Sequence, residues 1–160
     1  MPAPKYQGPT SVELKTIVGP QPGVAAYKDA VMWRLSKRGL TNLGIYNRRT
    51  VRGKTGILTT RNSSLHAVGR AWDAGTADTP EGKALGDELW LRTIHAAQQG
   101  LIGVQEIIWQ RQRWTADGVK PYRGTDPHTT HLHISFSIDW AQNRSPQADL
   151  RTWVTKALGY

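Results

Sequence analysis

The chain has 160 residues, of which 38% are hydrophobic, and no long polar or Gly/Ser-rich stretch divides it, so we expect one globular domain spanning residues 1–160. Cysteine is absent, which excludes disulfide bridges and thiolate metal sites. The formal net charge of +9 indicates attraction to polyanions, but the basic residues are scattered and accompany no nucleic-acid-recognition motif, so we do not favour nucleic-acid binding.

The first part of the chain predicts an extended arm followed by a helix. Residues 1–23 are rich in proline and show little periodicity, so we expect them to wrap the surface as an arm. Apolar residues at helical spacing, including Ala26, Ala30 and Trp33, predict a helix over residues 24–37 that Gly39 ends.

The middle of the chain mixes strand and helix patterns. β-forming residues between glycines predict short strands over residues 43–60, with a hairpin around residues 53–56. Residues 66–69 contain a glycine and predict a loop, and a strand is expected to begin at Ala71. Thr79 and Pro80 are typical of a helix start, so we expect a helix over residues 81–99 that ends at Gly100.

The last part predicts further strands and a final helix. Residues 104–114 alternate as a strand does, and Asp117-Gly118 indicates a turn after it. Residues 131–137 alternate strictly, so His131 and His133 point to the same side. A last helix is expected from Ser145-Pro146 to residue 158. This mixture favours an α+β fold with an antiparallel sheet packed with helices.

Two short stretches hold residues that can bind a metal: His66 and Asp73 in the first, and His131-Leu132-His133 in the second. A hydrolytic zinc site typically has three protein ligands of these types and one position open for water. Zinc lowers the pKa of bound water to about 7, which provides a nucleophile at neutral pH. Asp73 has a competing interpretation as a turn residue before Ala74-Gly75.

The pattern Ser64-x-His66-x-x-Gly69-x-Ala71-x-Asp73, followed by His131-x-His133, resembles zinc peptidases of bacterial cell walls, among them D-alanyl-D-alanine carboxypeptidases and L-alanyl-D-glutamate endopeptidases. Residues 121–136 resemble versions found in actinobacterial and phage cell-wall lytic enzymes. The resemblance implies a hedgehog/DD-peptidase-like fold and a Zn²⁺ cofactor. It also implies His66, Asp73 and His133 as zinc ligands and His131 as a catalytic imidazole that contacts the attacking water or the oxyanion.

Family members also use an upstream arginine that binds a substrate carboxylate or the oxyanion. Arg48, Arg49 and Arg52 are the candidates. Strand alternation would place Arg48 and Arg49 on opposite faces, and of these we choose Arg49.

One position departs from the family pattern. Many members carry Asp or Glu three residues before the last ligand as the general base, where this chain has Thr130. We favour His131 as the residue that transfers the proton. The alternatives are that Asp126, His128 or Glu106 reaches into the site and does so, or that the protein is weakly active or inactive.

These observations predict a zinc metallopeptidase that hydrolyses an amide bond in peptidoglycan stem or cross-bridge peptides, as a phage endolysin does. The alternative is a catalytically inactive peptidoglycan-binding module of the same fold. We expect a monomer whose positive charge draws it to the anionic wall, with neither nucleic acid nor membrane as a partner. The start of the chain lacks the features of a signal peptide, so we expect synthesis in the host cytoplasm and action at the wall.

Overall fold

The computed structural model describes residues 2–51, 54–142 and 149–160. It is an α+β structure whose six-stranded sheet has the order β1-β2-β6-β3-β4-β5, with every neighbouring pair antiparallel. The strands are β1 (Thr41–Gly44), β2 (Ala71–Gly75), β3 (Val104–Trp109), β4 (Gln112–Thr115), β5 (Gly118–Pro121) and β6 (His131–Phe136). The described part of the chain has five α-helices, α1 (Ser11–Thr16), α2 (Pro22–Leu35), α3 (Pro80–Gln98), α4 (Ile138–Ala141) and α5 (Leu150–Ala157), and two 3₁₀ helices, η1 (Ser36–Arg38) and η2 (Leu65–Val68).

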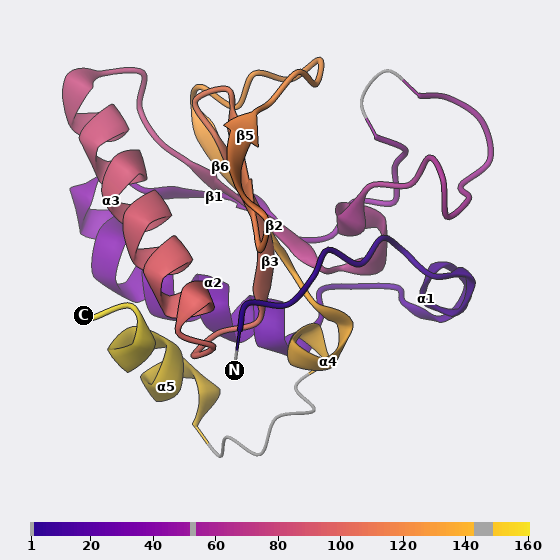
Figure 1. Cartoon of the computed structure of the whole chain (residues 1–160), viewed down its shortest axis with the longest axis horizontal. Helices are drawn as coiled ribbons and strands as arrows, with labels where there is room; N and C mark the ends of the chain where they lie inside the picture. Colours follow the sequence, from indigo (N-terminus) through magenta and orange to yellow (C-terminus); the bar gives the residue numbers. More distant parts are fainter. Residues whose placement is uncertain (1, 52–53, 143–148) are drawn as a thin grey trace.

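The two faces of the sheet have different surroundings. Helices α2, α3 and α5 lie on one side, whereas α1 and the described residues of the loop of residues 45–64 (45–51 and 54–64) lie on the other (Figure 1). Leu132, Ile134 and Phe136 are fully buried in the hydrophobic core that the helices cover. Alternation along β6 therefore directs His131 and His133 to the opposite face, away from the helices.

Helices α2 and α3 confirm the predicted helices in this part of the chain. α2 ends at Leu35, followed by η1 and by Gly39 with a φ of 98°. The Thr79 side chain accepts a hydrogen bond from the Gly82 amide at the start of α3, and Pro80 occupies the first turn. None of the helices in residues 2–51, 54–142 and 149–160 combines the length and apolarity that crossing a membrane requires.

The segment between β1 and η2 differs from the prediction. Short strands were predicted over residues 43–60. Beyond the end of β1, the described residues of this segment form an isolated bridge between Thr50 and Ser63 and no strand. Val51 and Ile57 are 40% and 89% exposed, so these two β-forming residues have no core against which a strand could pack. The expected hairpin falls partly on Gly53, which lies outside the described residues.

The single strand predicted over residues 104–114 is two strands. β3 and β4 form a hairpin through Gln110 and Arg111, whose φ values of 48° and 59° belong to a tight two-residue turn. Asn-Gly or Asp-Gly normally marks such a turn, so the sequence did not indicate it. The predicted turn at Asp117-Gly118 is confirmed between β4 and β5.

The two ends of the chain also need correction. Within the expected arm of residues 1–23, residues 11–16 form α1, because Thr10 and Glu13 make a capping box, and α2 already begins at Pro22. The last helix, α5, begins at Leu150 and is capped by the Asp149 side chain. The predicted start at Ser145-Pro146 lies outside the described residues.

Candidate metal centre

Three elements bring the predicted ligands together. η2 carries His66, and Gly69, with a φ of 65°, then turns the chain into β2, which carries Asp73. A side chain at Gly69 would collide with the Gly19 carbonyl, so glycine is needed there for both conformation and space. Asp73 and His133 are register partners across the β2–β6 pair, which explains why residues sixty apart meet.

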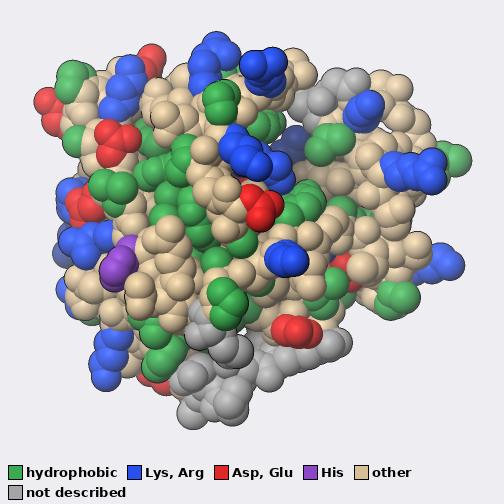
Figure 2. Space-filling view, in the orientation of Figure 1, with side chains coloured by type: hydrophobic (Ala, Val, Ile, Leu, Met, Phe, Trp, Pro, Cys, Tyr) green, Lys and Arg blue, Asp and Glu red, His purple; other side chains and the backbone are tan. Residues whose placement is uncertain are grey.

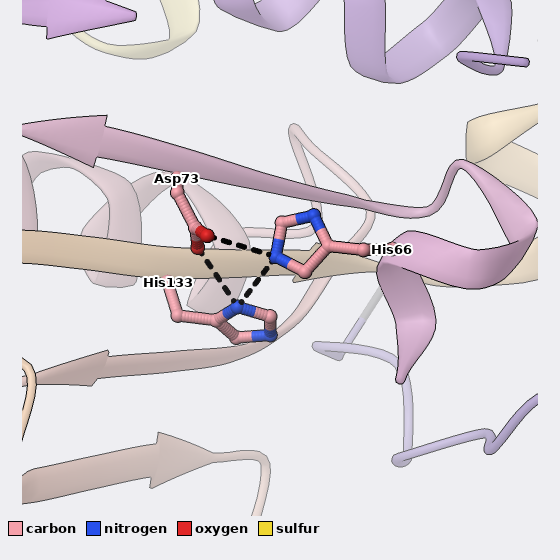
Figure 3. Close-up of side chains that lie close together, drawn as sticks. All are labelled: His66, Asp73 and His133. Atoms are coloured by element: carbon pink, nitrogen blue, oxygen red, sulfur yellow. Dashed lines mark hydrogen bonds and ion pairs between the residues drawn. The ribbon is translucent and has the colours of Figure 1, made fainter. Parts of the chain in front are cut away.

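The three side chains converge on one point (Figure 3). The Nε2 atom of His66 lies 3.2 Å from Nδ1 of His133 and 3.1 Å from Oδ2 of Asp73, and Nδ1 of His133 lies 3.1 Å from Oδ1 of Asp73. Tetrahedral zinc with bonds near 2.0–2.1 Å separates its ligand atoms by about 3.3 Å. The donor atoms therefore have the spacing that a zinc ion requires.

The environment of His66 selects the form that binds a metal. His66 is 2% exposed, and its Nδ1 lies 2.7 Å from the carbonyl oxygen of Ile45. A carbonyl only accepts hydrogen bonds, so Nδ1 carries the hydrogen and Nε2 presents a lone pair to Asp73 and His133. This is the usual arrangement of a metal-binding imidazole whose second nitrogen is held by a backbone carbonyl.

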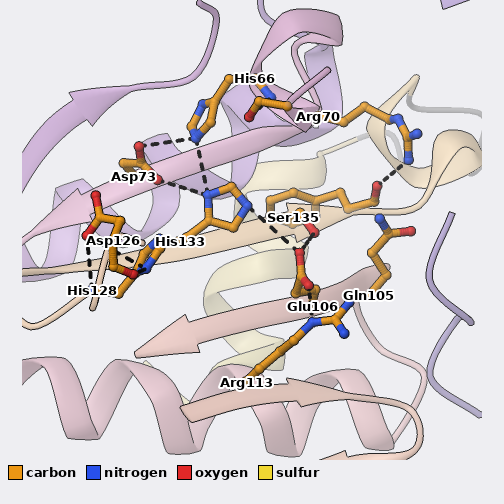
Figure 4. A network of polar contacts seen from close by, with 12 residues as sticks. His66, Arg70, Asp73, Gln105, Glu106, Arg113, Asp126, His128, His133 and Ser135 are labelled. Carbon is orange, nitrogen blue, oxygen red and sulfur yellow. Dashed lines mark hydrogen bonds and ion pairs between the residues drawn. The ribbon is translucent and has the colours of Figure 1, made fainter. Parts of the chain in front are cut away.

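A buried carboxylate lies behind the ring of His133. Its Nε2 lies 3.9 Å from Oε1 of Glu106, whose side chain is only 7% exposed. Glu106 in turn forms an ion pair with Arg113 and accepts a hydrogen bond of 3.4 Å from Ser135 (Figure 4). The metal-facing Nδ1 of His133 is thus opposite a fixed negative charge, which raises the basicity of a ligand histidine.

Electrostatics at the centre favour positive charge. Burial raises the pKa of Asp73, but its close contacts with the imidazoles of His133 and His66 outweigh burial and hold this pKa well below its usual range. Burial lowers the pKa of His133, yet the hydrogen bond and charge of Asp73 prevail and raise it. An ionised carboxylate beside two imidazoles can bind a metal ion, and the ion then displaces the proton that these groups would otherwise share.

A second group of side chains lies beside this centre: Asp126, His128 and His131, whose donor atoms lie within 4.8 Å of one another. The ring centroids of His128 and His131 are 4.6 Å apart, and those of His128 and His133 are 5.8 Å apart. Burial, followed by the charges of His133 and His131, lowers the pKa of His128 to about 4, and burial lowers that of His131. Both imidazoles are therefore neutral at pH 7.

Asp73 and His133 of the first group and all three residues of the second line one cleft of about 780 Å³. Three arginines, Arg49, Arg113 and Arg123, also line it, together with Tyr6 and Tyr122. In Figure 2, Lys and Arg side chains border a hollow between the strands and the loop of residues 45–64. The cleft thus combines candidate metal ligands with a positively charged rim.

Comparison with family models identifies the wider relationship. Residues 20–133, more than half of the chain, match the model described as VldE, C-terminal domain. The chain belongs to this family. The matched region contains His66, Asp73 and His133, and it ends at the last of these. Neither the curated proteins nor the solved structures contain a match to the chain.

The three candidate arginines have different surroundings. β1 ends at Gly44, so the strand on which the alternation argument relied is absent and that argument was wrong. Arg48 nevertheless points away, donating to the Leu14 carbonyl at 3.2 Å, whereas Arg49 lines the cleft with a nitrogen 3.9 Å from Asp73 Oδ2. Arg52 lies outside the described residues.

The residues considered as the general base lie at different positions around the site. Thr130 is exposed, and its carbonyl accepts a hydrogen bond from the Thr76 amide. Glu106 lies on one side of the His133 ring and Asp126 and His128 on the other (Figure 4). His131 lines the same cleft as Asp126 and His128. The sequence analysis missed the Ile45 carbonyl and Arg113, because neither belongs to a motif and both reach the site only through tertiary contacts.

Proposed function

We propose that the protein is a zinc peptidase that hydrolyses an amide bond in the stem or cross-bridge peptides of peptidoglycan, on a hedgehog/DD-peptidase-like fold. The observation that carries the proposal is the convergence of His66, Asp73 and His133 at zinc-ligand spacing, with the His66 tautomer set by Ile45. The resemblance of both motifs to cell-wall peptidases supports the substrate class. A bound zinc ion supplies Lewis-acid activation of a carbonyl and of water.

His131 is the residue that we propose for proton transfer. It lies on the same face of β6 as His133 and lines the cleft, and burial lowers its pKa, so it is unprotonated at neutral pH. A neutral imidazole can accept a proton from the attacking water and then donate it to the leaving amine. This assignment fits an exposed Thr130 at the position where many relatives carry an acid.

Arg49 is the residue that we propose for substrate binding. Its guanidinium is 41% exposed at the edge of the cleft, close enough to Asp73 to reach a group bound near the metal. A guanidinium binds a carboxylate with two parallel hydrogen bonds, and peptidoglycan stem peptides carry carboxylates. The net charge of +9 would draw a monomer to the anionic wall.

The site of action follows from this substrate. We propose that the enzyme acts at the bacterial cell wall after synthesis in the host cytoplasm, as a phage endolysin does. Lysis of intact cells only after their membrane has been permeabilised would support this.

A non-catalytic wall-binding module is the second candidate, and the observation that favours it is Thr130. The two functions differ in one product, because hydrolysis of an amide releases a new amino group whereas binding does not.

The test is digestion of purified peptidoglycan, with new amino groups quantified and new termini identified by mass spectrometry. We expect the His133→Ala variant to lose both zinc and amine release. His131→Ala should keep a zinc ion at the His66 centre while amine release falls about 100-fold or more, because proton transfer by a positioned side chain contributes about 10²–10⁴-fold. His95→Ala, which removes an exposed histidine from α3, is the matched control and should behave as the unmodified protein.

Two results would overturn the proposal. Undiminished amine release by zinc-free His133→Ala would exclude a metal-dependent reaction. Binding of wall fragments without amine release at any pH would establish the binding module.

A further inference from the structure

We propose that Asp126, His128 and His131 form a second divalent-cation site, separate from the centre of His66, Asp73 and His133. Its donors are two imidazoles and a carboxylate, the same ligand types as in the first centre, and they suit Zn²⁺ or a similar borderline metal. All three residues line the same cleft as the first centre.

The geometry of His128 makes its outer nitrogen available. Its Nδ1 lies 2.8 Å from the carbonyl oxygen of Asp126, so Nδ1 carries the hydrogen and Nε2 presents a lone pair. The backbone amide of His128 donates to Oδ1 of Asp126 at 3.1 Å, which holds this short loop together (Figure 4). His128 is 8% exposed, and its ring packs between those of Tyr122 and His131.

The second site is less compact than the first. The donor atoms of Asp126, His128 and His131 lie within 4.8 Å of one another, whereas those of the first centre lie 3.1–3.2 Å apart. Asp126 and His128 come from the loop between β5 and β6, and only His131 is on a strand. Binding therefore requires small rotations of side chains, so the second cation binds more weakly than the first.

A functional consequence follows if the proposed function holds. The lone pair with which His131 would accept a proton is the same lone pair that would bind the second cation. Occupation of the second site would then inhibit hydrolysis, so amide cleavage would rise with zinc until the first site is filled and fall as the second site fills.

The test is the number of zinc ions bound per chain at rising zinc concentration, measured by equilibrium dialysis and elemental analysis. We expect two ions for the unmodified protein and for the His95→Ala control, one bound tightly and one weakly. His128→Asn should keep the tight ion and lose the weak one. Asparagine tolerates the left-handed backbone at this position, where φ is 53°, so this variant limits disturbance of the loop.

Further variants separate the two sites and keep the test independent of activity. Asp126→Asn retains an oxygen for the His128 amide and removes the charge, so it should also weaken only the second ion. His66→Ala should keep the weak ion and lose the tight one. Saturation of the unmodified protein at one ion, or two ions retained in both His128→Asn and Asp126→Asn, would overturn the second site. If the unmodified protein binds two ions but releases no amines, the second site is supported and the proposed peptidase function is not.

Discussion

Behind the metal-facing nitrogen of His133 lies the buried carboxylate of Glu106, 3.9 Å from Nε2. Its own position is determined by Arg113 on β4 and Ser135 on β6. Since a carboxylate near the second nitrogen of a ligand imidazole makes that imidazole more basic, we expect Glu106 to act on the centre through His133.

We expect Glu106→Gln to lower zinc affinity about 10–100-fold, the range found when such supporting partners are changed. Gln keeps the size of the side chain and removes its charge. Competition with a chromophoric chelator measures the affinity. Glu88→Gln is the control, because Glu88 pairs with Arg38 and Arg92 rather than with the centre. Equal affinities in the two variants would show that the carboxylate has no effect on His133.

At the scale of elements, α1 is tied to the junction between η2 and β2. Arg70, at this junction, is fully buried and forms an ion pair of 2.7 Å with Glu13 on α1. It also donates to the carbonyls of Phe136 and Gly8. The N-terminal segment thus supports the turn that separates His66 from Asp73.

We expect Glu13→Ala to lower the free energy of unfolding by about 3–5 kcal/mol, because it leaves the Arg70 guanidinium buried without its counter-charge. Urea unfolding measures this change. Lys15→Ala alters an exposed residue of the same helix and should shift stability by no more than about 0.5 kcal/mol. A Glu13→Ala variant as stable as Lys15→Ala would show that the pair adds nothing to the fold.

At the scale of the whole molecule, the proposed zinc ion links η2, β2 and β6. A ligand that binds only the folded state stabilises it by about 2.7 kcal/mol at 100 times its Kd. The unfolded chain separates these ligands widely and cannot match the native donor set.

We therefore expect zinc at this excess to raise Tm by about 5–10 °C relative to protein treated with a chelator, since each kcal/mol shifts a domain of this size by about 2–4 °C. Calorimetry with and without zinc measures the shift. Asp73→Asn should remove most of it, because the charged ligand is lost. An unchanged Tm would contradict a zinc centre that joins these elements.

Local patterns predicted α3, β2 and β6, and the shared direction of His131 and His133, because helix capping and strand alternation act between residues close in the chain. Short motifs offered His66, Asp73 and one imidazole of the His131–His133 pair as ligands, and the resemblance to cell-wall peptidases implied His133. The β3–β4 turn escaped prediction because Gln110 and Arg111 are not residues that usually adopt positive φ.

The sequence alone therefore determined the α+β class and named His66, Asp73 and His133 as candidate ligands. Only the tertiary structure decided how they are held: the Ile45 carbonyl behind His66, Glu106 behind His133, and the second group of Asp126, His128 and His131 beside them. These relationships depend on strand register and on loops that pack across the sheet, so they join residues whose separation along the chain carries no local signal.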